Sequence, residues 1–177
     1  MPILKVICHQ DPSMLQRTGS RRYQDDSALD DVVSYCMNDK KTEHHLVGGF
    51  GVNLNQPAYE MRRVSEAYGK FKGLRLRHMV LSFSAQEVKR FRSHVYDSLS
   101  KIADYAARYY GGQYQIIYSI HEDSRCFHIH FVMNVVNFLT GKKYPGTKED
   151  YYNFQDYLGS FLREYYGLQL ITVSDKG

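Results

Sequence analysis

The sequence contains no tryptophan, only three cysteines and no long apolar run. Cys8, Cys36 and Cys126 form no CxxC pair and leave an odd count, which argues against a disulfide framework and against a zinc ribbon. A membrane span needs about 18 to 20 consecutive apolar residues, and no stretch approaches that length. The N-terminus also lacks the basic and apolar regions of an export signal. These absences predict a cytoplasmic protein with reduced thiols and no membrane segment.

The net charge of +4 and the isoelectric point of about 8.8 lean basic. Dedicated nucleic-acid-binding domains exceed an isoelectric point of about 9, so the net charge does not decide the function. The 16 tyrosines could stack on unpaired bases or simply pack with one polar end. The basic residues near expected loops either form a solvated surface or contact phosphates: Arg17, Arg21, Arg22, Lys40, Lys41, Lys70, Lys72, Arg75, Arg77, Lys142 and Lys143.

The hydrophobic fraction of 43% and the lack of repeats and linkers predict a single domain over residues 1–177. Alternating apolar and polar residues predict five strands, at residues 3–7, 76–83, 113–121, 127–137 and 168–173. Residues 46–54 contain three glycines, and we expect a bent strand or a loop there.

Three amphipathic helices are expected between the strands, at residues 27–38, 84–112 and 147–167. Ser27, Ser84 and Thr147 each precede an acidic residue by three positions, which is typical of a helix start. We therefore predict an α+β fold, with a central antiparallel β-sheet and flanking α-helices in a two-layer to three-layer sandwich. The two long helices should cover one face of the sheet and leave the other face for function.

Three of the eight histidines lie close together in the hairpin of residues 113–137. Residues i and i+2 of a strand point the same way, so His128 and His130 can converge on one ion. His121, on the paired strand, can supply the third ligand. Three imidazoles leave coordination positions open for a substrate oxygen, as a catalytic metal site requires.

Other interpretations of this segment stay open. The histidines could be ordinary surface residues on a polar sheet face. Cys126 is a rival ligand, and a thiolate would favour zinc. Asp123 could hydrogen-bond the outer nitrogen of a ligand histidine, or it could be an ordinary turn aspartate.

The motifs resemble those of the relaxase and mobilisation nuclease family in the HUH endonuclease superfamily, where U is a hydrophobic residue. His128-Ile129-His130 matches HUH, and the fuller pattern HxDxxxxHxH begins at His121 and is followed by Asn134. A strand with a histidine and a Ser-Phe ending appears at residues 78–83. A Tyr-hydrophobic helix before Lys-Thr appears at residues 35–42, with one inserted residue and a cysteine where a β-branched residue is commoner.

The resemblance implies roles for individual residues. Tyr35 would be the nucleophile, as in the branch with a single catalytic tyrosine. Either the nearby metal ion or Asp123 as a base could activate it, and the sequence does not choose between them. The histidine triad would hold a divalent metal ion, for which family habit suggests manganese or magnesium and imidazole ligands suggest zinc, nickel or copper. The implied DNA contacts are Ser82, Arg21, Arg22, Lys40, Lys41 and Asn134.

The implied activity is that of a relaxase, an enzyme that nicks and religates one DNA strand at an origin of transfer through a 5′-phosphotyrosine. It would initiate mobilisation of a plasmid or integrative element in a bacterial cytoplasm, with single-stranded DNA, accessory DNA-binding proteins and a conjugative coupling system as partners. The chain could be the N-terminal part of a longer protein. The alternatives are a rolling-circle replication initiator, a phosphodiesterase with a metal-activated water, and a non-catalytic DNA-binding module.

Overall fold

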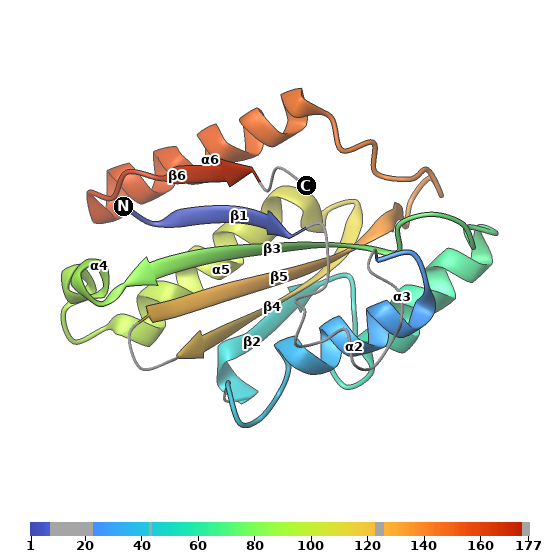
Figure 1. Ribbon diagram of the computed structural model, residues 1–177, viewed down its shortest axis with the longest axis horizontal. Helices are drawn as coiled ribbons and strands as arrows, with labels where there is room; N and C mark the ends of the chain where they lie inside the picture. Colours follow the sequence, from blue (N-terminus) through green and yellow to red (C-terminus); the bar gives the residue numbers. More distant parts are fainter. Residues whose placement is uncertain (8–22, 43, 123–125, 175–177) are drawn as a thin grey trace.

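A six-stranded sheet in the order β2-β4-β5-β3-β1-β6 forms the centre of the computed structural model, which describes residues 1–7, 23–42, 44–122 and 126–174 (Figure 1). The strands are β1 (Ile3–Ile7), β2 (Val47–Phe50), β3 (Leu76–Ser84), β4 (Tyr114–Glu122), β5 (Cys126–Asn137) and β6 (Ile171–Ser174). Neighbouring strands run antiparallel, as predicted, except that β1 and β6 run parallel at one edge. The strands that carry the histidines are therefore central.

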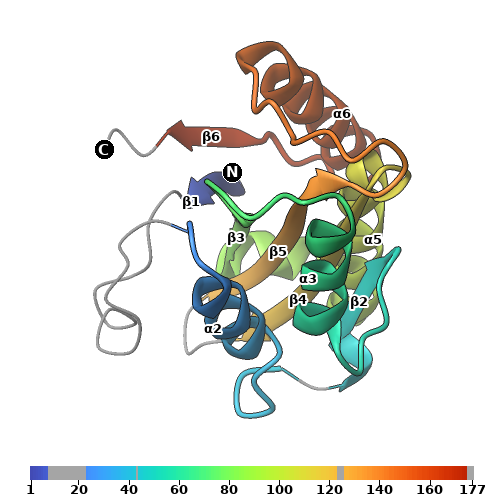
Figure 2. The same cartoon turned by 90° about the vertical axis from the view of Figure 1, so that its right-hand side faces the viewer.

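Helices cover both faces of this sheet, which gives the fold three layers (Figure 2). The helices α5 (Val95–Gly111) and α6 (Lys148–Tyr166) lie on one face, and α2 (Asp26–Cys36) and α3 (Pro57–Ala67) lie on the other. The α+β class and the flanking helices are confirmed. The second face, which we expected to be left open, is partly covered by α2 and α3. No helix in the described residues is both long and apolar enough to span a membrane.

Each face of the sheet has its own hydrophobic cluster. The larger cluster joins α5 and α6 to alternate residues of the central strands, among them Met79, Leu81, Phe83, Ile129, Phe131 and Met133. The smaller cluster joins α2 to Met61 of α3 and to residues of the opposite strand face, among them Leu76, Ile117 and Val132. The alternation in the sequence thus separates the two faces, because successive side chains of a strand point in opposite directions.

The helix starts follow local capping chemistry. The predicted helix start at Ser27 is wrong: the Asp25 side chain accepts a 2.8 Å hydrogen bond from the backbone N–H of Ala28, so Asp25 caps α2 and Ser27 lies within its first turn. Thr147 caps α6 and Gly167 ends it with φ 62°, both as predicted. The helix α3 was not predicted. It begins with a proline, which suits the first helical position because its missing N–H would have no helical partner.

The predicted long helix after β3 is interrupted in the structure. Ser84 and Glu87 form the predicted capping box, but α4 (Ala85–Val88) passes into a short 3-10 helix at Lys89–Phe91. Arg92 then adopts a positive φ of 54°, which a right-handed helix cannot continue through, and α5 begins at Val95. The apolar stripe nevertheless continues through this break, because Phe91 is buried in the same cluster as α5.

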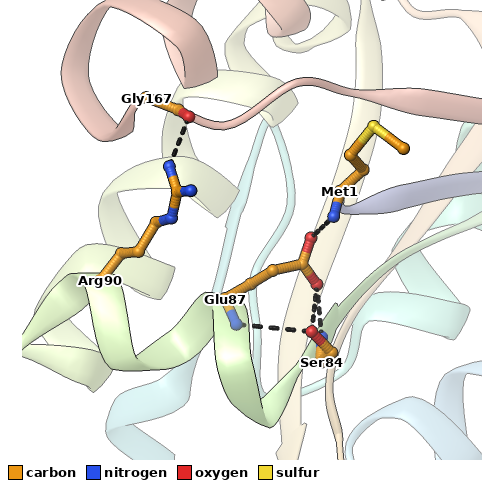
Figure 3. Close-up of polar contacts among 5 residues, drawn as sticks. All are labelled: Met1, Ser84, Glu87, Arg90 and Gly167. Atoms are coloured by element: carbon orange, nitrogen blue, oxygen red, sulfur yellow. Dashed lines mark hydrogen bonds and ion pairs between the residues drawn. The ribbon is translucent and has the colours of Figure 1, made fainter.

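Polar contacts fix this corner of the molecule (Figure 3). The Glu87 carboxylate accepts 2.7 Å hydrogen bonds from the backbone N–H and the hydroxyl of Ser84, and it also pairs with the Met1 ammonium. Arg90 donates a 2.6 Å hydrogen bond to the carbonyl of Gly167 at the end of α6. The start of β1, the helix α4 and the end of α6 are thereby connected.

Candidate nucleic-acid cleavage site

The central strands place the predicted histidine triad on the sheet face beneath α2. His128 of β5 lies directly opposite His121 of β4 and Ser82 of β3 in the strand register. His130, two residues further along β5, lies opposite Ser119 of β4. His121 and His130 are buried and His128 is half-buried, so this part of the sheet is no exposed surface.

The three rings and Tyr35 form one cluster. The ring centres of His121 and His130 are 4.4 Å apart, and those of His128 and His130 are 6.3 Å apart. The Tyr35 ring lies edge-on to both buried rings, at 5.7 Å from His121 and 5.6 Å from His130. Tyr35 therefore contacts histidines that lie more than eighty positions away in the sequence.

Packing of α2 against the sheet brings Tyr35 to this cluster. The helix buries the apolar face that its sequence predicts, through Ala28, Leu29, Val32, Val33 and Cys36. Tyr35 belongs to the last turn of α2 and is only half-buried, next to these residues rather than among them. The burial of one helix face thus places a half-exposed phenol beside the histidines.

A hydrogen bond fixes the end of α2 to the sheet. The Nε2 atom of His121 lies 2.7 Å from the carbonyl oxygen of Cys36, the last residue of the helix. A carbonyl only accepts, so Nε2 carries the proton and the lone pair of the ring is on Nδ1. The last carbonyls of a helix lack partners within the helix, and His121 supplies one.

His78 of β3 lies inside the cluster. Its Nε2 atom is 3.1 Å from Nδ1 of His130 and 3.9 Å from the sulfur of Cys36. Within the described ranges, the candidate ligand atoms of Cys36, His78 and His130 all lie within 4.8 Å of one another. The ligand atoms of the predicted triad, His121, His128 and His130, do not lie that close together. No sequence signal linked His78 to Cys36.

Burial keeps the clustered imidazoles neutral. Burial, with a smaller contribution from the neighbouring histidines, lowers the pKa of His130 to about 2 and that of His78 to about 4. The pKa of His121 is also lowered, chiefly by burial, against the opposing effect of its hydrogen bond to Cys36. Neutral imidazoles have the lone pairs that a metal ion needs, so these donors fit a divalent ion.

Lys41 adds a positive charge at the phenol. Its Nζ atom lies 4.1 Å from the centre of the Tyr35 ring, in a cation–π arrangement. The charge also contributes to the lowered pKa values of His121 and His130. Lys40 is exposed, and its backbone N–H bonds the side chain of Asn38. Of the two adjacent lysines, Lys41 is the one that the structure brings to the cluster.

The remaining predicted site residues differ in where they lie. Ser82 is half-buried and lies beside His128, on the same face of the sheet as the histidines. Arg21, Arg22 and Asp123 lie outside the described residues.

The prediction that Asn134 contacts DNA requires a correction, because the side chain of Asn134 is completely buried. Its amide nitrogen donates 3.0 Å hydrogen bonds to the carbonyl of Met61 and to the side chain of Gln115, and its oxygen accepts a hydrogen bond from the backbone N–H of Val136. These bonds connect α3 to the sheet and leave no amide group at the surface for DNA. In this fold, the hydrogen bonds of Asn134 stay within the protein.

A pocket of about 770 Å³ adjoins the cluster through Tyr23. The Tyr23 hydroxyl lies 3.3 Å from Nδ1 of His78, and its side chain also lines the pocket. Lys72, Arg77 and Lys143 line the same pocket, from segments that the sequence separates. The pocket therefore gathers cations beside the histidines.

Comparison with known proteins gives one match. The family model described as "Relaxase: MobA/VirD2-like, nuclease domain" matches residues 35–167, from Tyr35 to the glycine that ends α6. No curated protein and no solved structure matches the chain significantly. The matched residues include the three histidines, His78, Ser82 and Lys41.

Proposed function

The chain belongs to the relaxase family with a MobA/VirD2-like nuclease domain, and from this premise we propose that it cuts one DNA strand at an origin of transfer with Tyr35 as the nucleophile. The position of Tyr35 carries the proposal. Its ring contacts two histidines of the metal-binding motif, although these residues lie on separate elements. A tyrosine with only a structural role does not need to be half-exposed next to neutral imidazoles, as Tyr35 is.

Relaxases are metal-dependent, and we assign the ion to His121, His128 and His130. A bound divalent ion supplies charge neutralisation at the nonbridging oxygens of the scissile phosphate. The lowered pKa values of His121 and His130 support this assignment, because neutral rings bind cations without first losing a proton. Manganese or magnesium suits phosphate oxygens, whereas the imidazole donors also suit zinc, nickel or copper.

In the proposed reaction, the Tyr35 oxygen attacks phosphorus and the bond from phosphorus to the 3′ oxygen breaks. The products are a 5′-phosphotyrosine and a free 3′-hydroxyl. Lys41 holds the phenol ring and balances the negative charge that its oxygen develops. Asp123 is the proposed acceptor of the phenol proton. Because the phosphodiester is retained on the tyrosine, the reverse attack by a 3′-hydroxyl religates the strand without a nucleotide cofactor.

Relaxases bind single-stranded DNA, and we propose a path for the strand along the cations of this face. Lys41 and Ser82 flank the histidines, and the pocket lined by Lys72, Arg77 and Lys143 is also lined by Tyr23, which contacts His78. Cations neutralise phosphates and aromatic rings stack on unpaired bases. The pocket could therefore hold a nucleotide next to the cut, and Arg21, Arg22 and Lys40 would contact the flanking DNA.

The biological setting is part of the same proposal. We propose that the nick initiates transfer of a plasmid or integrative element in a bacterial cytoplasm. The partners would be accessory DNA-binding proteins and a conjugative coupling system. Support for this setting comes from the relaxase family alone.

The test is a covalent trapping experiment. Labelled single-stranded oligonucleotides that tile the DNA upstream of the gene are incubated with protein and Mn²⁺, and the products are separated on a denaturing gel. We expect a metal-dependent protein–DNA adduct that Tyr35→Phe abolishes. Tyr165→Phe, at a tyrosine that is 65% exposed and far from the cluster in sequence, is the matched control and should retain the adduct.

The other outcomes of this experiment separate the alternative functions. Cleavage without an adduct, unchanged by Tyr35→Phe, would indicate hydrolysis by a metal-activated water. If the protein does not cleave a known nick site, and if its DNA binding survives His128→Ala, the chain is a DNA-binding module. An adduct at a replication origin, and none at an origin of transfer, would indicate a rolling-circle initiator.

A further inference from the structure

We propose that Cys36, His78 and His130 form a second metal site, which binds a thiophilic ion such as Zn²⁺ and competes with the nicking ion for His130. The proposed nicking triad uses neither Cys36 nor His78. Two of the three residues of the new site therefore have no role in the proposed mechanism, and His130 is shared by both sites. Only the competition rests on the proposed function, because ion binding itself does not require a nuclease.

The geometry suits one ion. The candidate ligand atoms of the three residues all lie within 4.8 Å of one another, with 3.9 Å between the Cys36 sulfur and His78 Nε2 and 3.1 Å between His78 Nε2 and His130 Nδ1. An ion between atoms at this spacing needs only small side-chain adjustments to reach bonds of about 2.0 to 2.3 Å to nitrogen and sulfur. One sulfur with two nitrogens favours zinc or copper(I) over magnesium or manganese.

Tyr23 supports the required form of His78. Its hydroxyl oxygen lies 3.3 Å from His78 Nδ1 and can accept a hydrogen bond from it. A proton on Nδ1 leaves the lone pair on Nε2, which is the atom that faces Cys36 and His130. Metal-ligating histidines typically donate their other ring nitrogen to a neighbouring group in this way. The structure thus provides both the ligand atoms and a partner that orients one of them.

Metal binding must release a proton from Cys36. Burial raises the pKa of this thiol, so the residue enters the reaction as S–H. A sulfur–metal bond forms, the S–H bond breaks, and one proton per ion leaves to solvent. The two imidazoles contribute lone pairs and lose no proton. The thiolate also offsets one charge of a divalent ion, which reduces the cost of burying it.

Competition follows from the position of His130. A neutral imidazole offers one lone pair, so a ring that turns Nδ1 to Cys36 and His78 has none left for the triad. Zn²⁺ in the new site would therefore leave His121 and His128 with an incomplete ligand set. We expect micromolar Zn²⁺ to inhibit manganese-dependent nicking and Cys36→Ser to be less sensitive to this inhibition.

The deciding experiment uses Co²⁺ as a spectroscopic probe of the zinc site in the purified chain. We expect a thiolate-to-cobalt charge-transfer band in the near ultraviolet, saturating at one ion per chain, with release of one proton, and its loss on addition of Zn²⁺. Cys36→Ser and His78→Gln should abolish the band. Cys126→Ser is the matched control and should retain it, and His128→Ala should also retain it while losing the nicking activity.

A band that persists in Cys36→Ser, or that disappears in Cys126→Ser, would overturn the assignment. Circular dichroism of the metal-free variants shows whether they fold. X-ray absorption of the zinc-loaded wild-type chain gives a second measurement that needs no variant, and a shell without sulfur would also overturn the proposal. None of these readouts requires DNA, so failure of the second site and failure of the nicking proposal are distinguishable.

Discussion

Lys41 lies with its ammonium 4.1 Å from the centre of the Tyr35 ring, although it follows the last residue of α2 by five positions. The loop after the helix therefore folds back and returns a cation to the last helical turn. This loop contains the insertion that separates Tyr35 from the Lys-Thr motif. The contact shows that the insertion does not carry the lysine away from the tyrosine.

Replacement of Lys41 by glutamine should slow adduct formation roughly two- to fivefold, because a cation–π contact contributes about 0.5 to 1 kcal/mol. The rate should be measured in single turnover at saturating DNA, which separates chemistry from binding. Lys40→Gln, at the exposed neighbouring lysine, is the control and should weaken DNA binding without slowing the saturated rate. Equal slowing in the two variants would contradict a specific role for Lys41.

Replacement of the buried Asn134 by leucine should destabilise the fold by about 1 to 3 kcal/mol, because the groups that bond its amide lose their partner. Urea unfolding measures the change. Asn55→Leu, at an exposed asparagine, should shift stability by less than about 0.5 kcal/mol. If Asn134→Leu weakened DNA binding while leaving stability intact, the structural assignment would be wrong.

Replacement of Gly49 by alanine should destabilise the chain by about 1 to 3 kcal/mol through overpacking. A Cβ atom at this position would lie 2.5 Å from the backbone oxygen of Ile116 in β4, and backbone that is hydrogen-bonded within a strand pair cannot move aside cheaply. Gly112→Ala is the matched control, because nothing lies within 4 Å of its Cβ position. Thermal unfolding of both variants should show a lower midpoint for Gly49→Ala alone.

Acid should remove a stabilising contribution of Glu87. Burial by itself would raise the pKa of this carboxyl, but the hydrogen bonds from the Met1 ammonium and from Ser84 outweigh it, so the pKa is lowered. The contribution is therefore fully present above the unfolded glutamate pKa of about 4.3 and is lost as the pH falls through the lower folded value.

Urea unfolding between pH 7 and pH 3 tests this sign. Glu87→Gln should be less stable than the wild type at pH 7, and the difference should shrink on acidification. Glu164→Gln, at an exposed carboxylate, should show no such convergence. A difference that stayed constant down to pH 3 would mean that the charge of Glu87 does not matter.

The sequence predicted those features that depend on local pattern. The alternation along β4 and β5 placed His121, His128 and His130 on one face, and the structure confirms that placement. The caps at Ser84 and Thr147 are also confirmed, because a side chain that bonds a backbone N–H three residues away needs no tertiary partner.

Features that depend on distant contacts were missed. The helix α3 is mostly polar and is held by the buried side chains of Pro57 and Met61 and by a hydrogen bond from Asn134 of β5 to the Met61 carbonyl. The break at Arg92 carries no proline or glycine signal. The approach of Cys36 to His78 depends on how α2 lies across the sheet, which neither segment encodes alone.

The place of β1 in the sheet has a consequence for the order of folding. One edge of β1 pairs with β3, and the other edge pairs in parallel with β6, beginning with Ile3 beside Ile171. That second pairing joins segments from nearly opposite ends of the sequence. Strand pairing between residues so far apart in the sequence forms slowly. Until it forms, β1 is an edge strand with unpaired backbone groups that can capture strands of other chains. A chain that stops before residue 171 should therefore keep its histidine cluster but tend to aggregate.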